Sequence, residues 1–153
     1  MLFRSVLDEP SSGLDPIVRR DILGAVIRTI AHEGRTVLFS SHLLDEVEQV
    51  ADHVTMISHG KVALSAPLDA MKQSHRCVTV RFPESRPRPP AVAGVLRWDG
   101  AGQDWTAVCR EGSGELQAAL AGWGAQILAE REPTLDELFF AHVGIHAASE
   151  PDA

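Results

Sequence analysis

The sequence contains few cysteines, no long apolar run and no surplus of positive charge, and each absence excludes a class of protein. Cys77 and Cys109 are the two cysteines among 153 residues, and without a Cys-x-x-Cys pair we expect reduced thiols that pack inside the fold. No apolar run approaches the ~20 residues that span a bilayer, and the N-terminus lacks a signal-peptide pattern. The net charge of −7 is evenly spread, which argues against binding to nucleic acid. We therefore expect a cytoplasmic protein.

The composition is that of an ordinary globular protein, with 44% hydrophobic and 23% charged residues. Residues 1–75 alternate short apolar strands with amphipathic helices, the order that is typical of a parallel α/β sheet with flanking helices. Residues 76–146 contain several short strands separated by turn residues, and we predict a small α+β subdomain there. We expect the polar residues 147–153 to form a disordered tail.

Two adjacent carboxylates, Asp8 and Glu9, stand at the end of the first strand. Such a pair can hold Mg²⁺ with the first acid, while the second orients or deprotonates a water for attack on a phosphoryl group. His42 follows the next apolar strand, 36–40, and the carboxyl ends of parallel strands meet at one edge of a sheet, so we expect Glu9 and His42 to lie side by side. Each motif alone has an ordinary reading, as a plain turn before Pro10 or as a histidine that caps a helix.

Taken together, segments 6–16 and 37–42 resemble the Walker B, D-loop and switch-histidine segments of ATP-binding cassette (ABC) ATPases. The resemblance implies a partial P-loop NTPase (RecA-like) parallel sheet. On this resemblance Asp8 holds Mg²⁺, Glu9 is the general base for the attacking water, and His42 contacts the γ-phosphate. ATP and Mg²⁺ are then the cofactors of the site.

The same resemblance places Ser12 and Asp15 in the loop that crosses to a second cassette. It implies a membrane permease as a further partner and a position on the inner face of the cell membrane. Residues 130–140 resemble the closing helix of cassettes that serve drug- and antibiotic-export permeases. In this segment Pro133 precedes a helical turn that carries two acids. We therefore expect the exporter type, for which a small C-terminal subdomain is common.

The sequence departs from the family in two respects. Arg4 and Ser5 stand where the Walker B strand usually carries apolar residues, and no G-x-x-x-x-G-K-S/T motif, glutamine loop or Leu-Ser-Gly-Gly-Gln segment occurs in it. Losing three charge-assisted phosphate contacts removes roughly 4–9 kcal/mol of binding free energy, so we expect no ATP hydrolysis by the chain alone. A strand of the family's sheet is missing as well, and we expect strands 36–40 and 54–57 to stay apart or to close up with distortion. Two hypotheses remain: part of the ATP-binding subunit of an exporter, or a non-catalytic module that docks on a permease or an intact cassette.

The remaining residues predict packing roles. We expect Asp45, Glu46 and Glu48 to face solvent from the second helix, and Arg19 to lie on the wetter side of the first. The apolar face of that first helix is predicted to comprise Ile22, Leu23, Val26, Ile27 and Ile30. The three tryptophans should form the core of the subdomain, and the other six histidines should be surface or packing residues: these are Trp98, Trp105, Trp123 and His32, His53, His59, His75, His142, His146.

Overall fold

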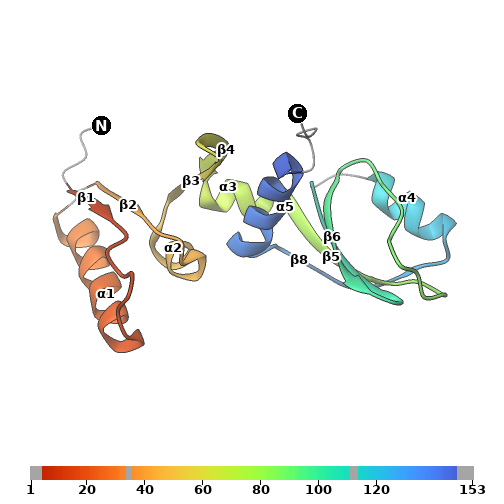
Figure 1. Ribbon diagram of the computed structural model, residues 1–153, viewed down its shortest axis with the longest axis horizontal. Helices are drawn as coiled ribbons and strands as arrows, with labels where there is room; N and C mark the ends of the chain where they lie inside the picture. The colour runs from red at the N-terminus through yellow and green to blue at the C-terminus, as the bar shows by residue number, and fades with distance from the viewer. Residues whose placement is uncertain (1–4, 34–35, 111–113, 148–153) are drawn as a thin grey trace. The chain divides into compact units, whose positions relative to one another are not determined.

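The computed structural model describes residues 5–33, 36–110 and 114–147 of the chain, which contain helices and strands in nearly alternating order (Figure 1). The chain divides into two compact units, Met1–Ala51 and Asp52–Ala153. The predicted domain boundary near residue 75 stays a prediction, because compactness does not define an evolutionary domain. The predicted tail lies, from residue 148 on, outside the described residues.

The first unit is a strand–helix–strand–helix segment. Its elements are β1 (Ser5–Asp8), α1 (Pro16–Glu33), β2 (Val37–Ser40) and α2 (Leu44–Val50). The two strands are parallel, with Ser5 opposite Val37 and Asp8 opposite Ser40, so their carboxyl ends coincide. Asp15 caps α1, since its Oδ1 accepts hydrogen bonds from the amides of Ile17 and Val18 at 2.9 and 3.1 Å. The predicted parallel pair and the predicted helix start are thereby confirmed.

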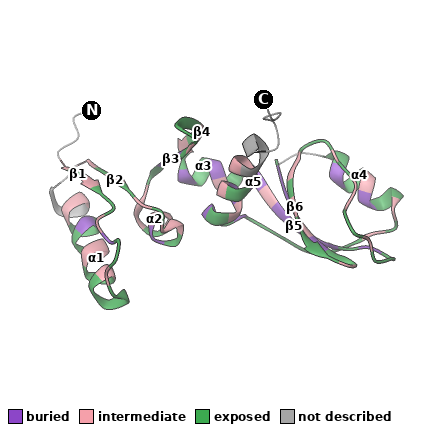
Figure 2. Ribbon diagram, viewed as in Figure 1, coloured by how far each residue is buried: buried purple, intermediate pink, exposed green. Residues whose placement is uncertain are grey.

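The first unit buries little apolar surface. Leu7 and Phe39 are paired in register and half-buried, whereas the neighbouring pair on the other face, Val6 and Leu38, is exposed. Figure 2 shows the ribbons of β1, β2 and α1 mostly in the colours of intermediate and exposed residues. In α1, Val26 is buried as predicted, but Ile27 is exposed, so the predicted apolar face was too wide by one residue. A two-stranded sheet covers only a narrow stripe of a helix, which explains why Ile27 remains in water.

Glu46 corrects a second expectation, because it is buried rather than solvent-facing, with 3% of its surface exposed. It lies three residues after Leu43 and four before Val50, within the apolar stripe of α2. Arg19 is half-buried beside it, since the two side chains form an ion pair. The prediction of a solvated face failed because it weighed the charge of Glu46 above its position on the helix.

The second unit is formed by the remaining elements. These are β3 (His53–Ser58), β4 (Lys61–Pro67), α3 (Leu68–Gln73), β5 (His75–Arg81), β6 (Val95–Ala101), β7 (Asp104–Arg110), α4 (Gly114–Gly122), β8 (Gln126–Arg131) and α5 (Leu135–Ala147). Strands β3 and β4 pair as an antiparallel hairpin, and a four-stranded antiparallel sheet has the order β6-β7-β5-β8. His59 and Gly60 connect the hairpin with φ angles of 48° and 72°, the left-handed conformations of a type I′ turn.

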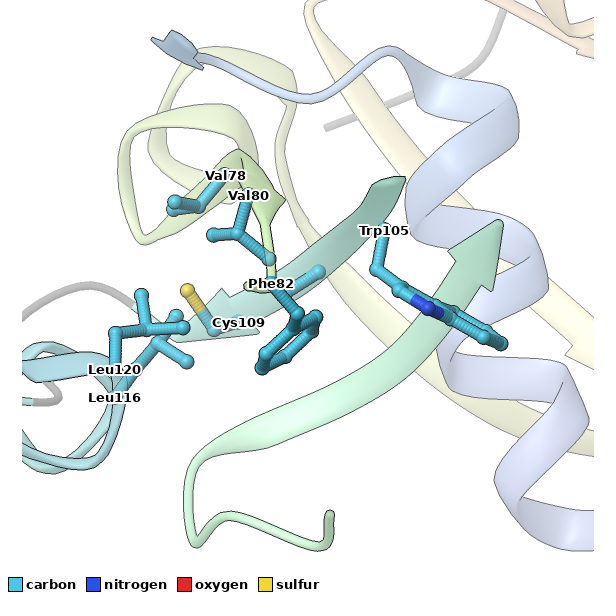
Figure 3. Packing of buried hydrophobic residues seen from close by; sticks show 8 residues of the cluster. Val78, Val80, Phe82, Trp105, Cys109, Leu116 and Leu120 are labelled. Carbon is cyan, nitrogen blue, oxygen red and sulfur yellow. The ribbon is translucent and has the colours of Figure 1, made fainter. Parts of the chain in front are cut away.

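One cluster of the core of the second unit lies between the four-stranded sheet and α4. Figure 3 shows its buried cluster, in which the alternate inward residues of β5 and β7 meet two leucines of α4: Val78, Val80, Phe82, Trp105, Ala107, Cys109, Leu116 and Leu120. Trp98 and Trp123 pack against this cluster and are partly buried. The predicted aromatic core of the subdomain is therefore confirmed.

Helix α5 packs on the opposite face of the same sheet. Val78 faces α4, whereas its neighbour Cys77 faces α5. The Cys77 thiol donates to Glu137 Oε1 of α5 at 3.6 Å. Cys109 belongs to the α4 face, so the two thiols lie on opposite faces, and both are buried and unpaired with each other. The predicted packing role of the cysteines is confirmed.

The fold is thus a mixture of helices and strands with three small sheets in the described part of the chain. Strands β2 and β3 belong to different sheets, as the gap argued from the sequence predicts. The parallel arrangement is confined to β1 and β2, and the other strand pairs described are antiparallel.

Candidate functional site

The carboxyl ends of β1 and β2 bring Asp8, Glu9 and Ser40 together. The Ser40 hydroxyl donates to Asp8 Oδ1 at 2.5 Å and accepts a hydrogen bond from the Glu9 amide at 2.9 Å. One side chain at the end of β2 therefore binds both Asp8, the last residue of β1, and Glu9, which follows it. Ser40 was not predicted as a site residue, although its register opposite Asp8 follows from pairing two equal strands.

Glu9 turns back from the end of β1 toward the end of β2. Its φ is 43°, in the left-handed region that non-glycine residues rarely adopt, and its carbonyl accepts from the Ser12 amide at 3.1 Å. In this conformation Glu9 Oε1 lies 3.1 Å from His42 Nδ1. The predicted proximity of Glu9 and His42 is confirmed.

The Glu9–His42 pair is open to water. The Glu9 side chain retains 46% of its exposed surface and the His42 side chain 59%. The Glu9 carboxylate can accept a hydrogen bond from a bound water, since an ionised carboxylate is a hydrogen-bond acceptor. Its hydrogen bond to Nδ1 fixes the orientation of the imidazole, which leaves Nε2 as the ring nitrogen available to a ligand.

Asp8 is exposed, and its carboxylate lies beside the Ser40 hydroxyl. Carboxylate and hydroxyl oxygens are hard donors of the kind that Mg²⁺ accepts. The described residues contain no group of three or more histidine, cysteine or acidic side chains that could hold a metal ion.

The loop between Asp8 and α1 presents two further predicted residues. Ser12 is exposed and joins the acid pair through its amide, which donates to the Glu9 carbonyl. Asp15 is exposed and lies at the N-terminus of α1, where it caps the helix. Gly13 between them has a φ of 71°, which a glycine adopts without strain. Ser12 and Asp15 therefore flank one tight turn and do not take part in the Glu9–His42 contact.

Sequence reasoning missed the buried residues that support this loop. Ser11, with 2% of its surface exposed, donates its hydroxyl to Glu46 Oε2 at 2.5 Å. Glu46 Oε1 lies 3.1 Å from Arg19 Nε, an electrostatic contact whose angle falls short of a hydrogen bond. Helical spacing from Leu43 and Val50 was the signal that could have placed Glu46 inside.

Comparison with curated proteins finds that this chain is similar to transporter ATP-binding proteins. Over 144 residues the chain is 30% identical to the uncharacterized ABC transporter ATP-binding protein YhaQ of Bacillus subtilis (strain 168), covering 91% of this chain and 48% of that protein. It is 42% identical over 72 residues to the bacitracin transport ATP-binding protein BcrA of Bacillus licheniformis, covering 46% of this chain and 23% of that protein. It is also 44% identical over 64 residues to the lantibiotic transport ATP-binding protein SrtF of Streptococcus pyogenes, covering 42% of this chain and 28% of that protein.

These relatives are ATP-binding proteins of transporters. The chain is homologous to part of the ABC transporter ATP-binding proteins, and two of these relatives are named for antibiotic transport, which confirms the resemblance found in the sequence. It spans about half the length, or less, of the curated relatives named here. No family model matches the chain. None of the helices in the described part of the chain combines the length and apolar character needed to cross a bilayer.

Proposed function

We propose that the chain supplies the catalytic carboxylate and switch histidine of an ATP-binding subunit of an ABC exporter. The observation that carries this proposal is the 3.1 Å contact between Glu9 and His42 beside Asp8, at the shared carboxyl ends of two parallel strands. Ligands of parallel α/β sheets bind at this edge. The first unit is then part of a P-loop NTPase sheet, and residues 76–146 are the small α+β subdomain of the exporter type.

In this proposal Glu9 takes a proton from the water that attacks the γ-phosphate. A positioned general base contributes roughly 10²–10⁴-fold to a rate. Asp8 would hold Mg²⁺ through its carboxylate, and the ion would neutralise charge on the phosphate oxygens. His42 orients the base through Nδ1 and contacts the γ-phosphate through Nε2.

The partners follow from the exposed loop and from the missing motifs. Ser12 and Asp15 face a second cassette, and the subunit works with a membrane permease on the inner face of the cell membrane. The 153 residues contain no G-x-x-x-x-G-K-S/T motif, so we propose that phosphate-binding groups from elsewhere complete the site. The chain by itself is then inactive.

The test uses the protein as its own cell makes it. A purification tag is added to the chromosomal gene, and the tagged protein is isolated in mild detergent with whatever accompanies it. Glu9→Gln should reduce Mg²⁺-dependent ATP hydrolysis about 10²–10⁴-fold while retention of labelled ATP persists. The matched control is Asp45→Asn, which removes an exposed acid from the first turn of α2.

Unchanged turnover in Glu9→Gln would contradict the assignment of the base. If the tagged protein captures a permease but neither binds nor hydrolyses ATP, the alternative function is correct. The chain would then be a non-catalytic module that docks on the permease.

A further inference from the structure

The first unit contains a buried carboxylate that the proposed reaction does not use. Glu46 is 3% exposed, yet it lies on the short helix α2, which begins two residues after His42. Burial of a charged side chain is unfavourable unless the charge is paired and hydrogen-bonded. The contacts of Glu46 therefore indicate what its burial accomplishes.

Glu46 and Arg19 hold the loop before α1 at two points. Glu46 Oε2 accepts from the buried Ser11 hydroxyl at 2.5 Å, and Glu46 Oε1 pairs with Arg19 Nε at 3.1 Å. Arg19 Nη2 in turn donates to the Leu14 carbonyl at 3.2 Å. The first and last residues of the segment Ser11–Leu14 are thus fixed by one ion pair that joins α1 to α2.

Within this segment the backbone has two further hydrogen bonds, the first of which runs from the Ser12 amide to the Glu9 carbonyl at 3.1 Å. The Leu14 amide lies 3.4 Å from the Ser11 carbonyl, near the limit for a hydrogen bond, and Gly13 has open space around the position of a Cβ atom. Ser12 is exposed at the centre of the segment. The side chains of Glu46 and Arg19 therefore hold the two ends of the segment that presents Ser12.

We propose that Glu46 is a positioning residue, which holds the loop Ser11–Asp15 in place relative to His42. Helix α2 starts beside His42 and carries Glu46 on its buried side, so the histidine and the loop are attached to one short rigid element. The inference rests on the proposed function, in which this loop faces a second cassette and His42 contacts the γ-phosphate. Glu46 itself touches neither substrate nor partner.

The structural test measures amide hydrogen exchange by NMR on the full chain. Ser11→Ala removes one hydroxyl and leaves the Glu46–Arg19 pair, so exchange at Ser12 and Leu14 should rise about five- to tenfold, the effect of one lost hydrogen bond. Glu46→Gln should raise exchange at the same two amides, and Asp45→Asn should not. Amides of β1 and β2 should be unchanged in Ser11→Ala, which separates a loose loop from an unfolded unit.

The functional test uses the tagged protein with its native partners. Ser11→Ala should lower kcat about tenfold and leave KM for ATP unchanged, because the loop is displaced while the nucleotide contacts persist. Ser11→Thr, which retains a hydroxyl, should restore most of the turnover. Unchanged exchange at Ser12 and Leu14 in Ser11→Ala would overturn the positioning role of Glu46, whereas intact turnover in Glu9→Gln would overturn the proposed function instead.

Discussion

The ion pair between Arg131 and Glu137 allows a quantitative prediction for the second unit. Arg131 ends β8 and binds Glu137 in the first turn of α5 with two hydrogen bonds, of 2.8 and 2.6 Å. Glu137 also closes a capping box, since its Oε2 accepts from the Thr134 amide at 2.8 Å and its own amide lies 3.3 Å from Thr134 Oγ1. These contacts favour the ionised carboxylate.

Hydrogen bonding to Arg131, opposed by partial burial and aided by the Thr134 amide, lowers the pKa of Glu137 from 4.5 to about 2. At about 1.36 kcal/mol per pK unit, this difference corresponds to about 3.4 kcal/mol. The Arg131 side chain is 50% exposed and the Glu137 side chain 29%, so solvent screening reduces the contribution to about 1–2 kcal/mol. The pair still ranks among the stronger polar contacts of the unit because it is bidentate.

Glu137→Gln tests this value, because glutamine preserves the capping box and removes the charge. At pH 7 the variant should lower the free energy of unfolding of the second unit by about 1–2 kcal/mol, a shift of about 1 M in the urea midpoint. Tryptophan fluorescence reports this unit selectively, since Trp98, Trp105 and Trp123 all belong to it. Glu132→Gln, which neutralises an exposed acid nearby, is the control.

The pH dependence follows from the direction of the shift. The folded-state pKa of Glu137 is depressed, so its contribution is complete above the unfolded value of 4.5 and is lost as the pH falls toward about 2. The difference between the unchanged chain and Glu137→Gln should therefore fall to less than half by pH 3. Equal effects of Glu137→Gln and Glu132→Gln at pH 7, or a difference that grows on acidification, would refute the reasoning.

Two further predictions concern the same unit. Burial, reinforced by the nearby Glu137 carboxylate, raises the pKa of Cys77 from 9.0 to about 11. In the variant Cys109→Ser, where Cys77 is the remaining thiol, the folded protein should react with iodoacetamide at pH 8 at least tenfold more slowly than the same variant unfolded in urea. Equal rates, read by mass spectrometry, would show an accessible thiolate. Gly122 lies at the end of α4 with open space around it, so Gly122→Ala should stabilise the unit by about 0.5–1 kcal/mol. Gly124 has a φ of 64°, so Gly124→Ala should destabilise the unit by about 1 kcal/mol. Shifts of the same sign in urea titrations would contradict this explanation.

Sequence periodicity located the helices and strands well but misjudged one turn. Residues 99–102 read Asp-Gly-Ala-Gly, a composition typical of a turn, yet β6 continues to Ala101, which pairs with Asp104. Gly102 alone supplies the left-handed residue of a two-residue turn, with a φ of 64°. Gly100 lies within the strand at a φ of 140°, where a Cβ atom would come within 2.4 Å of the Asp104 carbonyl oxygen. A glycine required by close backbone approach cannot be told from a turn glycine by composition.

The candidate site was predictable to the extent that it depends on parallel pairing. The proximity of Glu9 and His42 follows from two strands that end at one edge, and no further information is needed. The burial of Glu46 depends on which helix face meets α1, and its charge argued for the wrong face. Ser40 lies in the segment that resembles the switch-histidine motif but carries no charge and was assigned no role, so only the register reveals its two hydrogen bonds. The roles of the site residues in catalysis stay predictions.

The narrow sheet of the first unit has a practical consequence for handling the protein. Strands β1 and β2 are each other's strand neighbours in the described part of the chain, and Val6 and Leu38 lie in water on one face. An unpaired strand edge beside exposed apolar side chains can pair with a strand of another polypeptide. Preparations should therefore lose monodispersity as they are concentrated, and light scattering during concentration is the simplest early warning.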